Sequence, residues 1–149
     1  MPEFLETAVD KFTFKVAIDR LYNEEGIWAK PEGNLVRIGL SDFLQQRSGD
    51  VAFAEVKPVG TQVAFDDEIA VVETIKVNIS LTSPVTGKVV EVNTAMVTAP
   101  EAINQDPYGT GWLAVVEATD WQTDKANLLD PQAYFAKMKV EAEQEVKKI

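Results

Sequence analysis

The sequence contains few side chains that could carry out chemistry by themselves. It has no cysteine and no histidine, which excludes disulfides, thiolate nucleophiles, imidazole acid–base catalysis and most zinc sites. Carboxylates remain, but no acidic loop has the ligand spacing of a hard-cation site, so we expect neither a metal site nor catalytic residues. Any redox chemistry of sulfur would have to come with a cofactor. The composition therefore favours a carrier over an enzyme.

Lys76 is the remaining candidate, because it is the only basic residue between Lys57 and Lys88. It lies in a segment, residues 73–81, in which apolar and polar residues alternate, as is typical of a half-buried strand or hairpin. One face of this segment consists of Glu73, Ile75, Val77, Ile79 and Leu81. Lys76 lies in the middle of the other, polar face. The pattern by itself predicts only an exposed lysine that serves solubility or protects a sheet edge.

Four blocks of sequence say more about this lysine. They are VRIGLSDF (residues 36–43), GDVAFAEV (49–56) with VG (59–60), ETIK (73–76) with SPVTG (83–87), and NQDPYGTGWL (104–113). In this order and spacing they resemble the glycine cleavage system H-protein family, over residues 35–121 almost without gaps. The resemblance implies that Lys76 carries lipoate through an amide bond. It also implies that Glu73 is the acid that lipoyl domains present to the lipoate-attaching enzyme.

The fold that this resemblance implies is mainly β with short helices. We expect a lipoyl-domain-like flattened β-barrel (a barrel-sandwich hybrid) and a C-terminal amphipathic helix, together forming one carrier domain over residues 1–149. The barrel core would span about residues 12–119 and the helical extension about 124–149. Strands are predicted at residues 12–18, 27–30, 35–40, 51–56, 68–72, 88–92 and 112–118.

Two helices can be predicted from their first residues and their spacing. Asp42 with Gln45 three residues later forms a capping-box pattern, with Asp42 as the N-cap of a short helix. Asp130 followed by Pro131 starts the C-terminal helix. The apolar face of that helix would consist of Phe135, Met138, Ala142, Glu145 and Ile149, with Val146 alongside.

The implied function is transport of an aminomethyl group in glycine catabolism. The lipoyl arm would take this group from a pyridoxal-phosphate glycine decarboxylase and pass it to a tetrahydrofolate-dependent aminomethyltransferase. A flavin-dependent dihydrolipoyl dehydrogenase would then reoxidise the dithiol. Because a tethered group arrives at high effective concentration, small docking interfaces suffice for such a carrier.

The chain departs from the usual family pattern before Trp28, where an acid, a histidine and a second acid are common. Here Gly26 and Ile27 take the places of the histidine and the second acid, and Gln105 replaces an acid in the last block. These differences leave two alternatives open. One is an H-protein-like lipoate carrier for another redox complex, such as a heterodisulfide-reductase-like sulfur-oxidation system. The other is an unmodified binding module on the same fold.

The net charge of −10 restricts the partners further. A surface this acidic repels nucleic acids and anionic membranes, and favours proteins with basic docking faces. No apolar run approaches the roughly 18 residues that a transmembrane helix needs, and the first residues lack the basic region of a signal peptide. We therefore expect a cytoplasmic protein that binds neither nucleic acid nor membrane.

Overall fold

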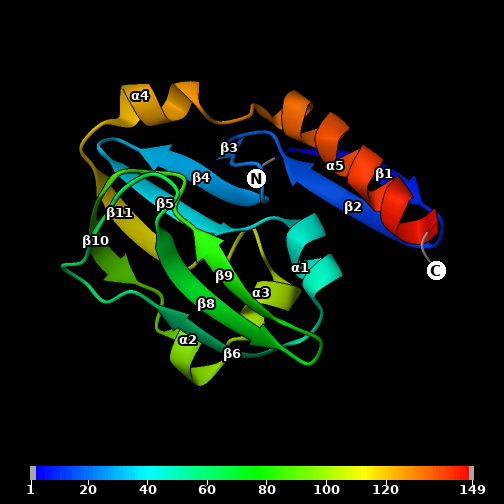
Figure 1. Cartoon of the computed structure of the whole chain (residues 1–149), viewed down its shortest axis with the longest axis horizontal. Coiled ribbons are helices and arrows are strands. Elements are labelled where there is room, and N and C mark those ends of the chain that lie inside the picture. The colour runs from blue at the N-terminus through cyan, green and yellow to red at the C-terminus, as the bar shows by residue number, and fades with distance from the viewer. Residues whose placement is uncertain (1–2, 148–149) are drawn as a thin grey trace.

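Two facing antiparallel sheets form the centre of the computed structural model, which describes residues 3–147 (Figure 1). In spatial order, the larger sheet consists of β3 (Leu21–Tyr22), β4 (Ile27–Glu32), β5 (Leu35–Leu40), β11 (Ala114–Ala118), β10 (Gly87–Val92) and β7 (Gln62–Val63). The smaller sheet consists of β6 (Val51–Val56), β8 (Glu68–Thr74) and β9 (Asn78–Thr82). Both sheets are open, so the predicted flattened barrel takes the form of a sandwich.

The main hydrophobic core lies between these two sheets. From the larger sheet, Ile38 and Val116 are fully buried, and Val72 and Leu81 face them from the smaller sheet. Strand β8 contributes two buried neighbours in sequence, Ile69 and Ala70, because its pairing with β9 shifts register between residues 68 and 70. Such a bulge turns two successive side chains towards the same side of a sheet.

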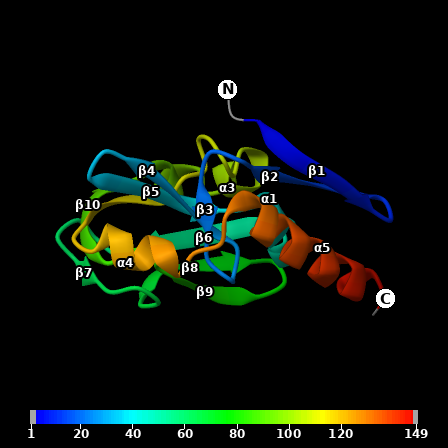
Figure 2. The same ribbon diagram turned by 90° about the horizontal axis from the view of Figure 1, so that it is seen from above.

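A second core lies outside the sandwich, under an N-terminal hairpin and the C-terminal helix. The hairpin consists of β1 (Phe4–Val9) and β2 (Phe12–Ala17), and the helix is α5 (Pro131–Lys147). These elements extend to one side of the sandwich in Figure 2. The buried side chains of this core are Val9, Phe14, Val16, Tyr22, Trp28, Phe43, Tyr134, Met138 and Ala142.

Strand β4 connects the two cores because side chains alternate between the faces of a strand. Ile27 and Ala29 pack into the core of the sandwich, whereas Trp28 between them packs into the second core. Tyr22 and Tyr134 stack there with ring centroids 4.4 Å apart and planes 8° from parallel. The amphipathic helix therefore packs on the body of the protein.

Four short helices complete the fold: α1 (Asp42–Ser48), α2 (Ala95–Thr98), α3 (Ala102–Gln105) and α4 (Trp121–Ala126). The predicted N-cap of α1 is wrong by one residue. Ser41 is the N-cap, and its Oγ accepts a hydrogen bond from the backbone N–H of Leu44. Asp42 is the first helical residue, and its Oδ1 accepts a hydrogen bond from the side chain of Gln45 instead.

Most of the predicted elements are confirmed, including the mainly β fold and the C-terminal helix. Asp130 caps α5 by accepting a hydrogen bond from the backbone N–H of Ala133 at 2.7 Å. The sequence did not predict β1, α4 or the burial of Tyr134. Glu145 does not belong to the apolar face, since its carboxylate forms an ion pair with Arg47. Ile149 lies outside the described residues.

The three tyrosines of the chain should make the protein unstable in alkali. Burial raises the pKa of Tyr108 to about 12 and also raises the pKa values of Tyr22 and Tyr134 above their ordinary value of 10.0. Above pH 10 the unfolded chain therefore loses phenolic protons that the folded chain keeps, and the free energy of unfolding falls by up to about 4 kcal/mol per pH unit.

In an alkaline titration, tyrosinate absorption should consequently appear together with the loss of far-ultraviolet circular dichroism. A Tyr134→Phe variant should lose about a third of this pH dependence, because one of three titrating groups is gone. Ionisation of Tyr22 or Tyr134 while the circular dichroism stays native would contradict the burial of these two side chains.

Candidate functional site

Lys76 lies at the tip of the hairpin formed by β8 and β9. Of the two structures predicted for residues 73–81, the hairpin is confirmed and a continuous strand is wrong, because residues 75–77 form the turn and the last cross-strand pair is Glu73 with Asn78. The turn is closed by a 2.8 Å hydrogen bond from the backbone N–H of Thr74 to the carbonyl of Val77. Its side chains extend beyond the sheet, so Ile75 is 76% exposed rather than part of the buried face.

Thr74 holds this tip in place. Its hydroxyl oxygen accepts hydrogen bonds from the backbone N–H groups of Lys76 at 3.1 Å and Val77 at 3.0 Å. The same hydroxyl donates to the carbonyl of Ser48, at the C-terminal end of α1, at 2.7 Å. The last carbonyls of a helix have no partner within the helix. The end of α1 thus serves as an anchor for the tip, a role that sequence reasoning did not assign to Thr74.

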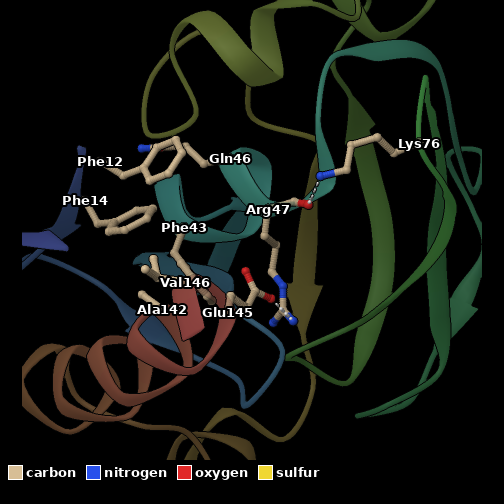
Figure 3. Close-up of a pocket in the computed structure, with 9 residues that line it drawn as sticks. All are labelled: Phe12, Phe14, Phe43, Gln46, Arg47, Lys76, Ala142, Glu145 and Val146. Carbon is tan, nitrogen blue, oxygen red and sulfur yellow. Dashed lines mark hydrogen bonds and ion pairs between the residues drawn. The ribbon is translucent and has the colours of Figure 1, made fainter. Parts of the chain in front are cut away.

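The side chain of Lys76 has a defined direction. Its Nζ donates a hydrogen bond of 3.2 Å to the carbonyl of Arg47, which also lies in the last turn of α1 (Figure 3). On the way, its aliphatic part passes Gly49, where an added Cβ would lie 2.9 Å from the Cδ of Lys76. Gly49 also has a φ of +94°, which favours glycine. The lysine therefore points over the end of α1.

Glu73, the second predicted site residue, is exposed on β8. It pairs with Asn78 on β9 and with Phe53 on β6, three residues before the lysine. Both predicted residues are therefore at the same end of the smaller sheet and open to a partner protein.

Two pockets flank the anchored tip. The first, which we call the aromatic pocket, is lined by Phe12, Phe14, Phe43, Gln46, Arg47, Lys76, Ala142, Glu145 and Val146 (Figure 3). The second, which we call the acidic pocket, contains four carboxylates, from Glu24, Glu25, Glu141 and Glu145, and the hairpin residues 77–81.

Arg47 and Glu145 line both pockets and form an ion pair with each other. Their side chains are 39% and 37% exposed, so the pair contributes only about 0–1 kcal/mol to stability. The aromatic pocket and the acidic pocket are therefore separated by a contact that opens at little cost.

Another residue that the sequence analysis overlooked is Asn104, which positions the segment between α1 and β6. Its side-chain N–H groups donate to the side chain of Gln45 and to the carbonyl of Gly49, each at 3.0 Å. Its oxygen accepts a hydrogen bond of 2.8 Å from the backbone N–H of Val51. Asn104 is the first residue of the block NQDPYGTGWL, one of the four that resemble the family. Its position in that block was the feature of the sequence that could have identified it.

Gly26, one of the departures from the family pattern, lies directly against α5. An added Cβ would lie 2.7 Å from the phenol oxygen of Tyr134 and 2.8 Å from the Oγ of Ser41. These two hydroxyl groups hydrogen-bond to each other at 2.9 Å. A histidine side chain would therefore collide with α5 at this position. The neighbouring Ile27 is fully buried in the main core, while Glu25 lines the acidic pocket.

Comparison with known proteins agrees with this arrangement. Residues 20–141 match the family model of the glycine cleavage H-protein. The chain belongs to this family. A probable glycine cleavage system H protein of Natronomonas pharaonis is 41% identical over 126 residues, which cover 85% of this chain and 98% of that relative.

Further H-proteins support the assignment. A glycine cleavage system H protein of Thermus thermophilus is 40% identical over 83% of this chain and 96% of that relative. The crystal structure of a glycine cleavage system H protein from Mycobacterium marinum superposes with a TM-score of 0.70 at 32% identity, covering 80% of this chain and 95% of that one.

Parts of this H-protein lie outside the family match. The match begins at residue 20 and ends at residue 141, so it excludes β1, β2 and the last part of α5. Within residues 3–147, no helix combines the length and the apolar character that crossing a membrane requires.

Gly26→Ala should destabilise this H-protein by about 2–4 kcal/mol, because it combines a strained positive φ with overpacking against Tyr134. Urea unfolding monitored by tryptophan fluorescence would measure the loss. Gly33→Ala is the matched control, since Gly33 also has a positive φ, of +69°, but an added Cβ would meet nothing within 4 Å. Equal losses in the two variants would contradict the proposed collision with α5.

Proposed function

We propose that this H-protein carries lipoate in amide linkage on Lys76 and works in the cytoplasm as a single carrier domain of the glycine cleavage system. It would shuttle an aminomethyl group from glycine decarboxylase to aminomethyltransferase, with dihydrolipoyl dehydrogenase reoxidising the arm. The observation that carries this proposal is the position of Lys76. It is an exposed lysine at an anchored hairpin tip, in a chain whose family carries lipoate on a lysine.

The surroundings of Lys76 fit an acylated lysine. Its Nζ contacts a backbone carbonyl, that of Arg47, and an amide nitrogen would keep one N–H to donate to it. Lipoate bound there would supply a disulfide that can open to two thiols, chemistry that a chain without cysteine lacks. The role of the protein is then to expose and orient the arm. Thr74 and the end of α1 do this by fixing the turn.

The carboxylates of the acidic pocket suit a positively charged cargo. An aminomethyl group carries an amine, which is protonated near neutral pH, and the carboxylates of Glu24, Glu25, Glu141 and Glu145 attract such a charge. Glu24 and Glu25 lie directly before Gly26, so the pocket keeps its acidic character although Ile27 replaces the usual second acid.

The partners are proteins, and the net charge of −10 favours basic docking faces on them. We assign Glu73 to recognition by the lipoate-attaching enzyme, since it is exposed three residues before Lys76. The curated relatives are named as glycine cleavage H proteins. The comparisons therefore do not favour a carrier for another redox complex or an unmodified binding module.

Lys76→Arg should abolish lipoylation and leave the fold intact, because arginine keeps the positive charge but offers no amine for acylation. We expect a change in unfolding free energy below about 0.5 kcal/mol, as for other exposed positions. Intact mass and tryptic mapping, after expression with lipoate and a lipoate ligase, provide the readout. Lys88→Arg, at an exposed lysine of β10, should retain the lipoyl mass. Absence of the lipoyl mass from Lys76 of the wild-type protein would contradict the proposal.

Glu73→Gln should slow lipoylation about tenfold, which corresponds to the loss of about 1.4 kcal/mol, an amount typical of one charged contact. The measurement is the initial rate of lipoyl transfer by the ligase, followed by mass spectrometry. Glu55→Gln serves as the control, because Glu55 is an exposed acid on the neighbouring strand β6. An unchanged rate in Glu73→Gln would remove the recognition role.

A further inference from the structure

The aromatic pocket lies beside Lys76 and is built largely by segments that lie outside the family match. Phe12 and Phe14 come from β2, and Ala142 and Val146 come from the end of α5, whereas the match covers residues 20–141. Phe43 of α1 forms the third aromatic wall, with its ring at 77° to that of Phe14 and the centroids 5.4 Å apart.

The pocket has the size of a small ring. Its volume is about 170 Å³, and an apolar protein cavity of about 150 Å³ holds a benzene molecule. Its walls suit sulfur as well as carbon, because divalent sulfur packs favourably against the edges and faces of aromatic rings. The guanidinium carbon of Arg47 lies 5.2 Å from the ring centroid of Phe43. This guanidinium forms an ion pair with the carboxylate of Glu145, so the two charges in the wall of the pocket neutralise each other.

Lys76 leads into this pocket. Its side chain lines the pocket, and its Nζ lies at the carbonyl of Arg47, between the hairpin tip and the aromatic side chains (Figure 3). The glycine at position 49 lets the aliphatic part of the lysine follow this route. An extension of Nζ therefore starts at the edge of the pocket.

We propose that the aromatic pocket is a resting site for the oxidised dithiolane ring of the lipoyl group on Lys76, an inference that rests on the proposed function. The oxidised ring is neutral and apolar, and it fits aromatic walls better than the four carboxylates of the acidic pocket. A cationic cargo has the opposite preference. The Arg47–Glu145 pair stands between the two pockets, so the state of the arm decides on which side of this pair its end lies.

Occupation of the pocket should be partial. Ordering a long flexible arm costs conformational entropy, and a carrier must release its arm to partner enzymes. We therefore expect the ring to exchange between the pocket and solvent, with the pocket as the more populated position.

The test measures how fast the dithiolane is reduced. The full-length protein is lipoylated, its modification is checked by intact mass, and it is then treated with a limiting water-soluble phosphine. The loss of the near-ultraviolet absorption of the dithiolane ring follows the reaction. Because the chain has no cysteine, the lipoyl group is the one disulfide in the protein that the phosphine can reduce.

Phe12→Ala opens the pocket and should raise the reduction rate about fourfold, since a ring that is bound about three quarters of the time reacts at about a quarter of its free rate. Phe4→Ala is the matched control. Phe4 is on the same hairpin and is 40% exposed, against 39% for Phe12, but its ring lies against Tyr108, at 5.7 Å between centroids. This variant should react like the wild type.

Unfolding of the β1–β2 hairpin in the Phe12→Ala variant could also raise the reduction rate, so a second measurement uses the wild-type protein. In the wild-type lipoylated protein, nuclear Overhauser contacts should join the dithiolane protons to the ring protons of Phe12, Phe14 or Phe43. Equal reduction rates for wild type, Phe12→Ala and free lipoamide, without such contacts, would overturn the resting site and leave the proposed function intact. Absence of the lipoyl mass on Lys76 would overturn both.

Discussion

The hairpin tip depends on the exposed carbonyl groups at the end of one short helix. The last turn of α1 offers acceptors that the helix itself cannot satisfy, and the hairpin supplies the donors: Thr74 to Ser48 and Lys76 to Arg47. Each bond contributes only about 0.5–1.5 kcal/mol, yet together they join an otherwise exposed turn to the body of the protein. Lys76, an exposed residue of this turn, is thereby held in one place.

The second core extends this arrangement from one side. The N-terminal hairpin and α5 pack on the outer face of β4 through Trp28, Tyr22 and Tyr134. By doing so they bring additional side chains up to α1, next to the lysine. The sandwich, the hairpin tip and the acidic residues before β4 all lie within residues 20–141, which match the family model. β1, β2 and the end of α5 lie outside this match, and β2 and the end of α5 line the aromatic pocket beside the lysine.

Regular elements could be predicted from the sequence because their signal is local. Alternation located the strands around residues 12–18 and 88–92, and the Asp130-Pro131 pair located the start of α5. The position of Lys76 in a turn was not predictable from alternation, since its apolar neighbours Ile75 and Val77 extend the pattern through the reversal of the chain. Contacts between distant segments left no local signal either. The ion pair of Arg47 with Glu145, and the stacking of Tyr134 on Tyr22, arise only when α5 folds back.

The contact between Gly26 and α5 also bears on how such a chain can diverge. Because a side chain at position 26 and the phenol of Tyr134 would compete for the same space, substitutions at the two positions are not independent. A glycine at position 26 leaves this space to the phenol of Tyr134, which bonds to Ser41. A larger residue at position 26 would require α5 to move. In related chains we therefore expect a glycine at position 26 and a tyrosine at position 134 to occur together.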